Sequence, residues 1–114
     1  MSDIVAIYAV FGSDEEARRI GRDMIERRLA ACVNILGPCH SIYRWQGKVE
    51  EAGEVAAIFK TGSQGVATLI AAISDAHSYD VPAIAALPVV DTPGDYARWV
   101  ESESGGPAAS DRSV

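Results

Sequence analysis

Few side chains in this sequence of 114 residues combine a type and a position suited to metal binding, and the clearest is His77. It follows an apolar, helix-like stretch and precedes Ser78 and Tyr79. Imidazole is the commonest side-chain ligand for metals such as copper and zinc, so His77 is a candidate ligand for Cu(II) or another divalent cation. A histidine at a helix C-terminus can instead simply face the negative end of the helix dipole, and both interpretations stay open. With one imidazole, we expect weak binding only.

The two cysteines and the other histidine lie close together in the chain. Cys32 opens an apolar strand, where a free cysteine usually packs as a small hydrophobic residue. Cys39 and His40 are adjacent and suit a soft metal, but neighbours on a strand point to opposite faces unless a bulge intervenes. In an extended strand Cys32 and Cys39 are about 23 Å apart, whereas a disulfide needs Cα atoms within roughly 7 Å. We therefore expect free thiols, as in a reducing compartment.

No arrangement of residues points to catalysis. The sequence has no serine, histidine and acid at triad spacing, no His-Glu-x-x-His, no Cys-x-x-Cys and no phosphate-binding glycine loop, so we predict that the protein is not an enzyme. The net charge of −6, without a cluster of Lys and Arg, argues against nucleic acid or an anionic membrane as a partner. The sequence shows neither a membrane-spanning apolar run nor a basic and apolar leader, so we expect a cytoplasmic protein.

The first elements that position these residues are a strand and a helix. An unbroken apolar run at 4–11 predicts a central strand buried on both faces. The acidic stretch that follows predicts a helix reaching to about residue 31, with Ser13 accepting from the backbone N–H of Glu16 and the Glu16 carboxylate returning to the backbone of Ser13.

Three further elements are predicted toward the C-terminus. Apolar residues at helical spacing indicate a second helix from about residue 63 to 75–77. A last strand is predicted at 83–90, where Pro88 requires either the edge of a sheet or a bulge. Thr92, with Pro93 behind it, predicts the cap of a third, short helix.

A long hairpin dominates the middle of the sequence. Strand-forming residues run from Cys32 to Thr61 around a tight turn at Gln46-Gly47, with a bulge expected at Gly37-Pro38. The arms are longer than the roughly five or six residues of a typical strand, so they should extend beyond the domain. Tyr43 and Trp45 share one face of this hairpin. Because an uncovered edge invites association, we expect a second copy of the chain to cover it, with Tyr43 and Trp45 as interface anchors.

The order β-α-β-β-α-β predicts an α+β fold, a ferredoxin-like sandwich with both helices on one face of a four-stranded antiparallel sheet, plus an extra C-terminal helix. Residues 1–103 are expected to form this single domain. The segment 104–114 consists of small and polar residues without periodicity, and we predict a disordered tail there.

The sequence also resembles the CutA family of divalent-cation tolerance proteins from about residue 5 to 100. The matching motifs, in order, are residues 26–34 (ERRLAACVN), 41–48 (SIYRWQGK), 77–82 (HSYDVP) and 87–89 (LPV), with Glu54, Lys60, Thr61, Tyr96 and Trp99. The resemblance implies a homotrimer whose hairpins pack between subunits, a link to copper and other divalent cations, and no established catalytic activity.

Site residues follow from the same resemblance. The family's proposed copper ligands, a cysteine and two adjacent histidines, fall on Val10, Ala76 and His77, of which only His77 has a ligating side chain. Family positions also suggest a polar cleft between subunits, formed by Cys32, Glu54, Lys60, Tyr79 and Tyr96. Two other functions stay open: a trimeric small-ligand sensor similar to the nitrogen-regulatory proteins, and an enzyme of unknown reaction.

Overall fold

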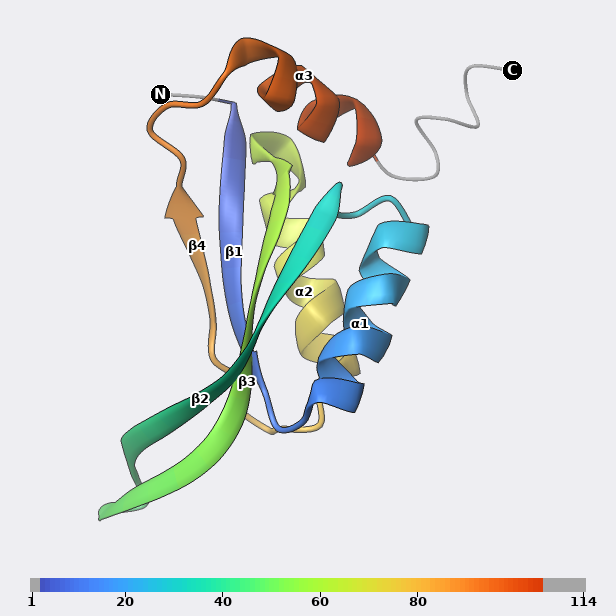
Figure 1. Cartoon of the computed structure of the whole chain (residues 1–114). Coiled ribbons are helices and arrows are strands. Elements are labelled where there is room, and N and C mark those ends of the chain that lie inside the picture. Colours follow the sequence, from blue (N-terminus) through green and yellow to red (C-terminus); the bar gives the residue numbers. More distant parts are fainter. Residues whose placement is uncertain (1–2, 106–114) are drawn as a thin grey trace.

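The computed structural model describes residues 3–105 (Figure 1). Its elements are β1 (Ile4–Phe11), α1 (Asp14–Glu26), β2 (Cys32–Trp45), β3 (Lys48–Gly62), the 3₁₀ helix η1 (Ser63–Gly65), α2 (Val66–Ala76), β4 (Ile84–Pro88) and α3 (Gly94–Glu103). No helix in this part of the chain is long and apolar enough to cross a membrane. Most of the tail predicted at 104–114 lies outside the described residues.

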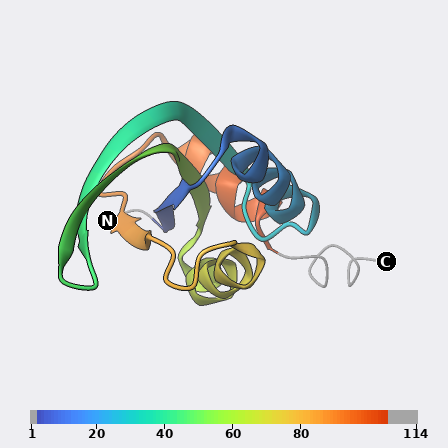
Figure 2. The ribbon, with the colours of Figure 1, turned by 90° about the horizontal axis from the view of Figure 1, so that it is seen from below.

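The four strands form one antiparallel sheet in the order β2-β3-β1-β4. Figure 2 shows α1 and α2 side by side on one side of this sheet, with the hairpin of β2 and β3 reaching away from them. This is the predicted ferredoxin-like sandwich, and β4, which contains Pro88, is an edge strand as expected. The extra helix α3 packs instead at the end of the sheet where β1 begins, with Val100 against Ile4 and Ala31.

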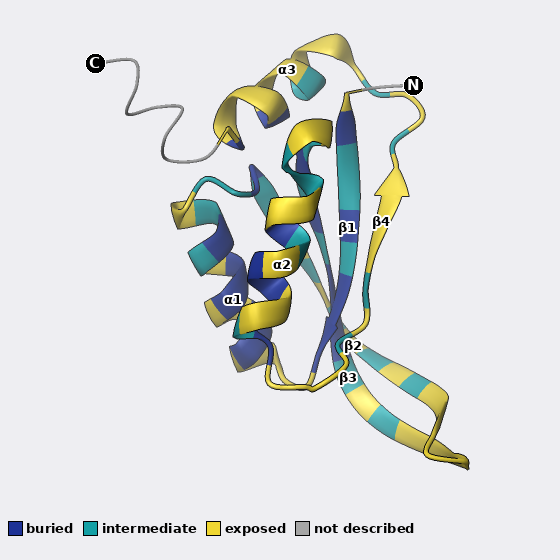
Figure 3. Cartoon of the chain, turned by 180° about the vertical axis from the view of Figure 1, so that it is seen from behind, coloured by how far each residue is buried: buried dark blue, intermediate teal, exposed yellow. Residues whose placement is uncertain are grey.

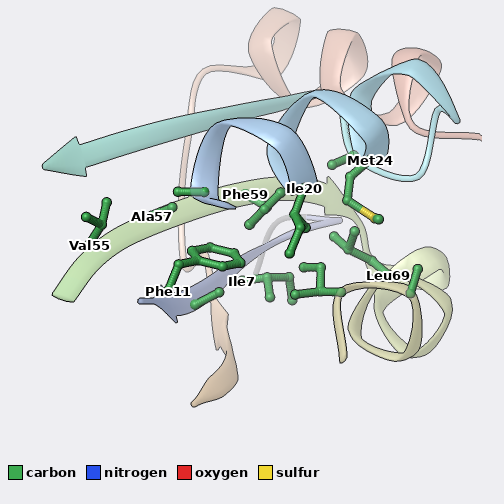
Figure 4. Close-up of a cluster of buried hydrophobic side chains, with 13 residues drawn as sticks. Ile7, Phe11, Ile20, Met24, Val55, Ala57, Phe59 and Leu69 are labelled. Carbon is green, nitrogen blue, oxygen red and sulfur yellow. The ribbon is translucent and has the colours of Figure 1, made fainter. Parts of the chain in front are cut away.

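The core lies between the sheet and the two helices (Figure 4). Alternate residues of the central strands face it, so that Ile7 and Phe11 of β1 lie beside Phe59 of β3, all fully buried. From the helices, Ile20 and Leu69 close the cluster. The other face of the sheet is not covered by α1 or α2, and this uncovered face is where the candidate site lies.

Helix α1 ends earlier than predicted, at Glu26 instead of about residue 31. The chain leaves the helix through Arg28, whose φ of 61° is left-handed, and the N–H groups of Arg28 and Leu29 bond to the carbonyls of Ile25 and Met24. This is a Schellman motif, which usually has glycine in the left-handed position. Arg28 donates a 2.7 Å hydrogen bond to the backbone carbonyl of Ser102 at the end of α3, which offsets the cost of the conformation.

The hairpin has the predicted features. Gln46 and Gly47 both take positive φ in the turn, Gly37 has a φ of 103°, and the β2–β3 register shifts between Ile35 and Gly37. Beyond the Phe11–Val55 pair, β3 is bonded to β2 alone, so the hairpin extends past the sandwich. Figure 3 shows this extension in the colours of intermediate and exposed residues, whereas many residues inside the sandwich, such as those of β1, have the colour of buried residues.

The C-terminal part departs from the prediction in two details. Helix α3 begins at Gly94 with Pro93 at the cap position, so Thr92 is not its cap; the Thr92 N–H bonds to the Asp91 side chain instead. Ser104, predicted to lie in the tail, is buried, and its hydroxyl accepts from the N–H of Gly62 and donates to the carbonyl of Val100.

Candidate functional site

A groove of about 750 Å³ runs between the hairpin and the loop that follows α2. Strand alternation places Tyr43 and Trp45 on the face of the hairpin that looks into the groove, beside Tyr8 of β1. The opposite wall is the segment after α2, in which Pro82 favours an extended conformation for the preceding residue. The groove thus combines aromatic side chains with the carboxylates of the hairpin and the loop.

A hydrogen bond across the groove joins two of the predicted cleft residues. The Tyr79 hydroxyl donates to Oε2 of Glu54 at 2.8 Å. Burial raises the pKa of Tyr79 to about 12, and the hydrogen bond and negative charge of Glu54 add to the effect. Tyr79 is therefore a proton donor at neutral pH and not a base. It lies against Gly12, where a Cβ would come within 3.0 Å of the hydroxyl oxygen, so the small residue permits this position.

The two predicted interface anchors lie in the same groove. Tyr43 and Trp45 are 40% and 44% exposed, although large aromatic side chains are usually well buried. They stand opposite Glu50 and Lys48 in the hairpin register. Their exposure in one chain is consistent with an interface role, which stays a prediction.

The remaining cleft residues form a second cluster near α3. The Cys32 sulfur and the Tyr96 hydroxyl are 3.6 Å apart, and Lys60 is the cross-strand partner of Cys32. Burial, followed by the bond to Cys32, raises the pKa of Tyr96 to about 12. Lys60 lies six positions after Glu54 in β3, which is roughly 20 Å along a strand. One chain therefore does not unite the five predicted residues, and a single cleft would have to draw on more than one subunit.

His77 lies in a closed polar cluster where β1 ends, α1 begins and α2 ends, a region that we call the base of the sandwich. Its side chain has no exposed surface, and its ring stacks on Phe11 with 5.0 Å between the centroids. Nε2 donates to the Val10 carbonyl at 2.7 Å, and Nδ1 accepts from the N–H of Tyr79 at 3.1 Å. Both ring nitrogens are thus bonded within the chain, so metal binding by His77, which stays a prediction, would require this cluster to open. The family's copper set does not fit, because Val10 and Ala76 lack ligating side chains.

Glu16 completes this cluster and also corrects a prediction. Ser13 caps α1 by accepting from the Glu16 N–H at 3.1 Å, as expected. The Glu16 carboxylate does not return to Ser13 but accepts from the N–H and hydroxyl of Ser78, at 2.8 and 3.1 Å. Burial acts to raise the pKa of Glu16, yet these hydrogen bonds outweigh it and hold the pKa below its ordinary value of 4.5.

The other candidate ligands are on the hairpin. Cys32 and Cys39 are free thiols, as predicted. His40 and Cys39 are placed on opposite faces, because regular alternation resumes after the bulge. His40 instead pairs with Glu51 across the strands, with 2.6 Å between Nε2 and Oε1. Counting outward from the two-residue turn places His40 diagonally across from Glu51 on one face of the hairpin, and this is the sequence signal for the pair. Among residues 3–105, no three or more His, Cys, Asp or Glu side chains are grouped to hold a metal ion.

Comparisons with known proteins agree on one family. A family model described as CutA1 divalent ion tolerance protein matches residues 5–103. The "Divalent-cation tolerance protein CutA" of Thermus thermophilus is 39% identical over 105 residues, covering 92% of this chain and 100% of that protein. A "Protein CutA homolog" of Xenopus laevis is 39% identical over 95 residues, and the match spans 83% of this chain but 63% of that longer protein. A solved structure, the "Periplasmic divalent cation tolerance protein CutA" of Archaeoglobus fulgidus, superposes with a TM-score of 0.85 at 38% identity, covering 89% of this chain and 98% of that one.

Proposed function

Because the chain belongs to the CutA1 divalent ion tolerance family, we propose that it is a divalent-cation tolerance protein that acts as a homotrimer and binds Cu(II) or another divalent cation weakly. The proposed role is binding, without catalysis, and the relatives of Thermus thermophilus and Archaeoglobus fulgidus are named as tolerance proteins and not as enzymes. The two free thiols support a reducing, cytoplasmic location for this chain.

The observation that carries the trimer is the hairpin. Tyr43 and Trp45 are both partly exposed on an extension that only β2 and β3 form, and they line a groove. Leu36 and Leu87, on strands at the two edges of the sheet, are 61% and 47% exposed. Exposed apolar surface on this scale marks an interaction site, and a symmetric assembly of identical chains would cover it in every copy.

Light scattering at micromolar concentration tests this proposal. We expect three times the chain mass of 12.1 kDa. The double variant Tyr43→Ala, Trp45→Ala should dissociate, because truncating one central aromatic anchor typically costs about 2 kcal/mol or more. Ile42→Ala is the matched control, since Ile42 directly precedes Tyr43 in β2 but lies on the opposite face of the hairpin. A monomer mass for the wild type would refute the trimer, and an intact double variant would move its anchors elsewhere.

A small-ligand sensor is the second candidate, and the groove favours it. Its volume of about 750 Å³ suits a small organic molecule, and the Tyr79–Glu54 pair could orient one by hydrogen bonding. Thermal unfolding with Cu(II) and, separately, with nucleotides distinguishes the two candidates, since a ligand that binds the folded state raises the melting temperature. A shift with nucleotides alone would favour the sensor over the cation-binding protein.

A further inference from the structure

We propose that His40, oriented by Glu51 from the opposite strand, is the side chain through which this protein binds Cu(II) or a similar divalent cation. This inference rests on the proposed cation-binding function and assigns it to the hairpin. The sequence contains two histidines, and the ring nitrogens of His77 are both bonded within the base. Any binding that depends on imidazole must therefore use His40 unless the base opens.

The geometry of His40 leaves one ring nitrogen available. A carboxylate can only accept, so Nε2, at 2.6 Å from Oε1 of Glu51, must carry the proton and donate it. In a neutral imidazole the lone pair is then on Nδ1. Within residues 3–105, the His40 imidazole makes no other hydrogen bond, and this side chain is 64% exposed. Nδ1 can thus meet a hydrated ion without breaking any contact.

This arrangement is the one that metal-binding histidines commonly use. A ligating imidazole usually donates its second N–H to a carboxylate or a carbonyl, which fixes the tautomer and makes the other nitrogen a better ligand. Glu51 already supplies such a carboxylate before a metal binds. Cu(II) stands at the top of the affinity order for nitrogen and oxygen ligands, so it should bind more tightly than Zn(II) or Ni(II).

The surroundings of His40 are open to an ion and its water molecules. Its cross-strand partner is Gly53, and no atom lies within 4 Å of the position that a Cβ would occupy there. Tyr43 and Trp45 belong to the opposite face of the hairpin, because alternate residues of a strand point in opposite directions. A trimer that closes over the aromatic face would therefore leave the His40–Glu51 face accessible.

The same structure limits the affinity. No third His, Cys, Asp or Glu in the described part of the chain joins the pair, so water molecules must fill the remaining coordination positions. An open site of this kind exchanges its metal readily, unlike a closed centre with three or four protein ligands.

Titration with CuCl₂, followed by calorimetry and by electron paramagnetic resonance, tests the assignment. We expect His40→Gln to weaken the binding of Cu(II) by at least about 10-fold and to remove the nitrogen hyperfine splitting of its spectrum. Glu51→Gln should weaken binding by about 10-fold, the lower end of the effect of losing an orienting carboxylate. Glu50→Gln makes the same charge change on the opposite face of β3 and should have a much smaller effect.

A measurement on the wild type needs no variant to fold. Substoichiometric Cu(II) should broaden the amide NMR signals of residues 39–41 and 51–53 first, while those of Ser78 and Tyr79 at the base persist. Binding that survives His40→Gln, or broadening centred on the base, would overturn the assignment but leave cation binding intact. A wild type that does not bind Cu(II) at all would overturn both.

Discussion

Polar side chains are bonded and buried at the base of the sandwich, but they are largely exposed on the hairpin. At the base, Glu16 accepts two hydrogen bonds from Ser78, His77 is bonded to the backbone of Val10 and Tyr79, and both Glu16 and His77 are buried. On the hairpin, His40 and Glu51 make one bond with each other, and more than half of each side chain is exposed. The base closes its polar groups within the fold, and the hairpin leaves them available.

The two histidines make this difference concrete. Each one has an oxygen acceptor within 2.7 Å of Nε2, so the same tautomer is favoured in both. They differ at Nδ1, which in His77 accepts from the Tyr79 backbone and in His40 has no partner within residues 3–105. Residue type alone therefore does not identify a ligand. What decides is whether the fold has already used the lone pair.

A pair of identical substitutions gives the largest expected contrast between these regions. Ile7→Ala should lower the free energy of unfolding by about 2–5 kcal/mol, because Ile7 is fully buried and its loss leaves a cavity. Ile42→Ala on the hairpin, where the side chain is 65% exposed, should change it by no more than about 0.5 kcal/mol. Denaturant unfolding at one fixed protein concentration measures both.

Equal losses of unfolding free energy in Ile7→Ala and Ile42→Ala would contradict the difference in burial between the sandwich and the hairpin. A large cost for Ile42→Ala would mean that the His40 face of the hairpin is buried in the assembly, and it would also remove the access that Cu(II) needs at that face.

Local sequence rules predicted the elements that depend on near neighbours. The Ser13 cap, the bulge at Gly37, the turn at Gln46-Gly47 and the edge position of Pro88 all follow from the conformational limits of individual residues. The fold class followed from the order of these elements. None of these predictions required knowledge of distant contacts.

Two incorrect predictions, the return of Glu16 to Ser13 and the length of α1, involve contacts that only the folded chain creates. Glu16 bonds to Ser78, which lies 62 residues away, and no local pattern shows that this partner will displace Ser13. Arg28 ends α1 early because Ser102 holds its side chain, a contact across 74 residues. The sequence likewise does not show that the Val10 carbonyl, 67 residues away, bonds to His77. Of the candidate site, the sequence placed Tyr43 and Trp45 on one face of the hairpin but did not indicate the groove that they line, and it missed the pairing of His40 with Glu51.

An effect of intermediate size is expected for the stability contributed by a buried carboxylate, that of Glu16, which should depend on pH. The folded-state pKa of Glu16 is held below 4.5, so its charged form stabilises the fold at any pH above 4.5, and this contribution is lost as the pH falls through the lowered value. Glu16→Gln should therefore cost about 1–2 kcal/mol at pH 7 and less as the pH drops below 4.5.

Glu15→Gln is the matched control, because Glu15 sits in the same helical turn with 80% of its side chain exposed and only a loose pair with Arg19 at 3.7 Å. We expect it to change stability by less than about 0.5 kcal/mol at either pH. Chemical unfolding of both variants at pH 7 and pH 4 gives the comparison, and a pH-independent loss in Glu16→Gln would show that packing, and not its charge, matters at that position.

The smallest expected effects concern the C-terminal boundary of the folded domain. The hydroxyl of Ser104 accepts from the N–H of Gly62 and donates to the Val100 carbonyl at 2.6 Å, so Ser104→Ala leaves a backbone donor unsatisfied in a buried place and should cost about 1 kcal/mol. Removing residues 106–114 should change neither the melting temperature nor the oligomeric state, because apart from Pro107 that segment has no apolar side chain larger than alanine before Val114. Differential scanning calorimetry and light scattering of the two variants check this order. If the truncation lowered stability more than Ser104→Ala does, the tail would be shown to dock on the domain, and the boundary of the folded domain would then lie beyond Gly105.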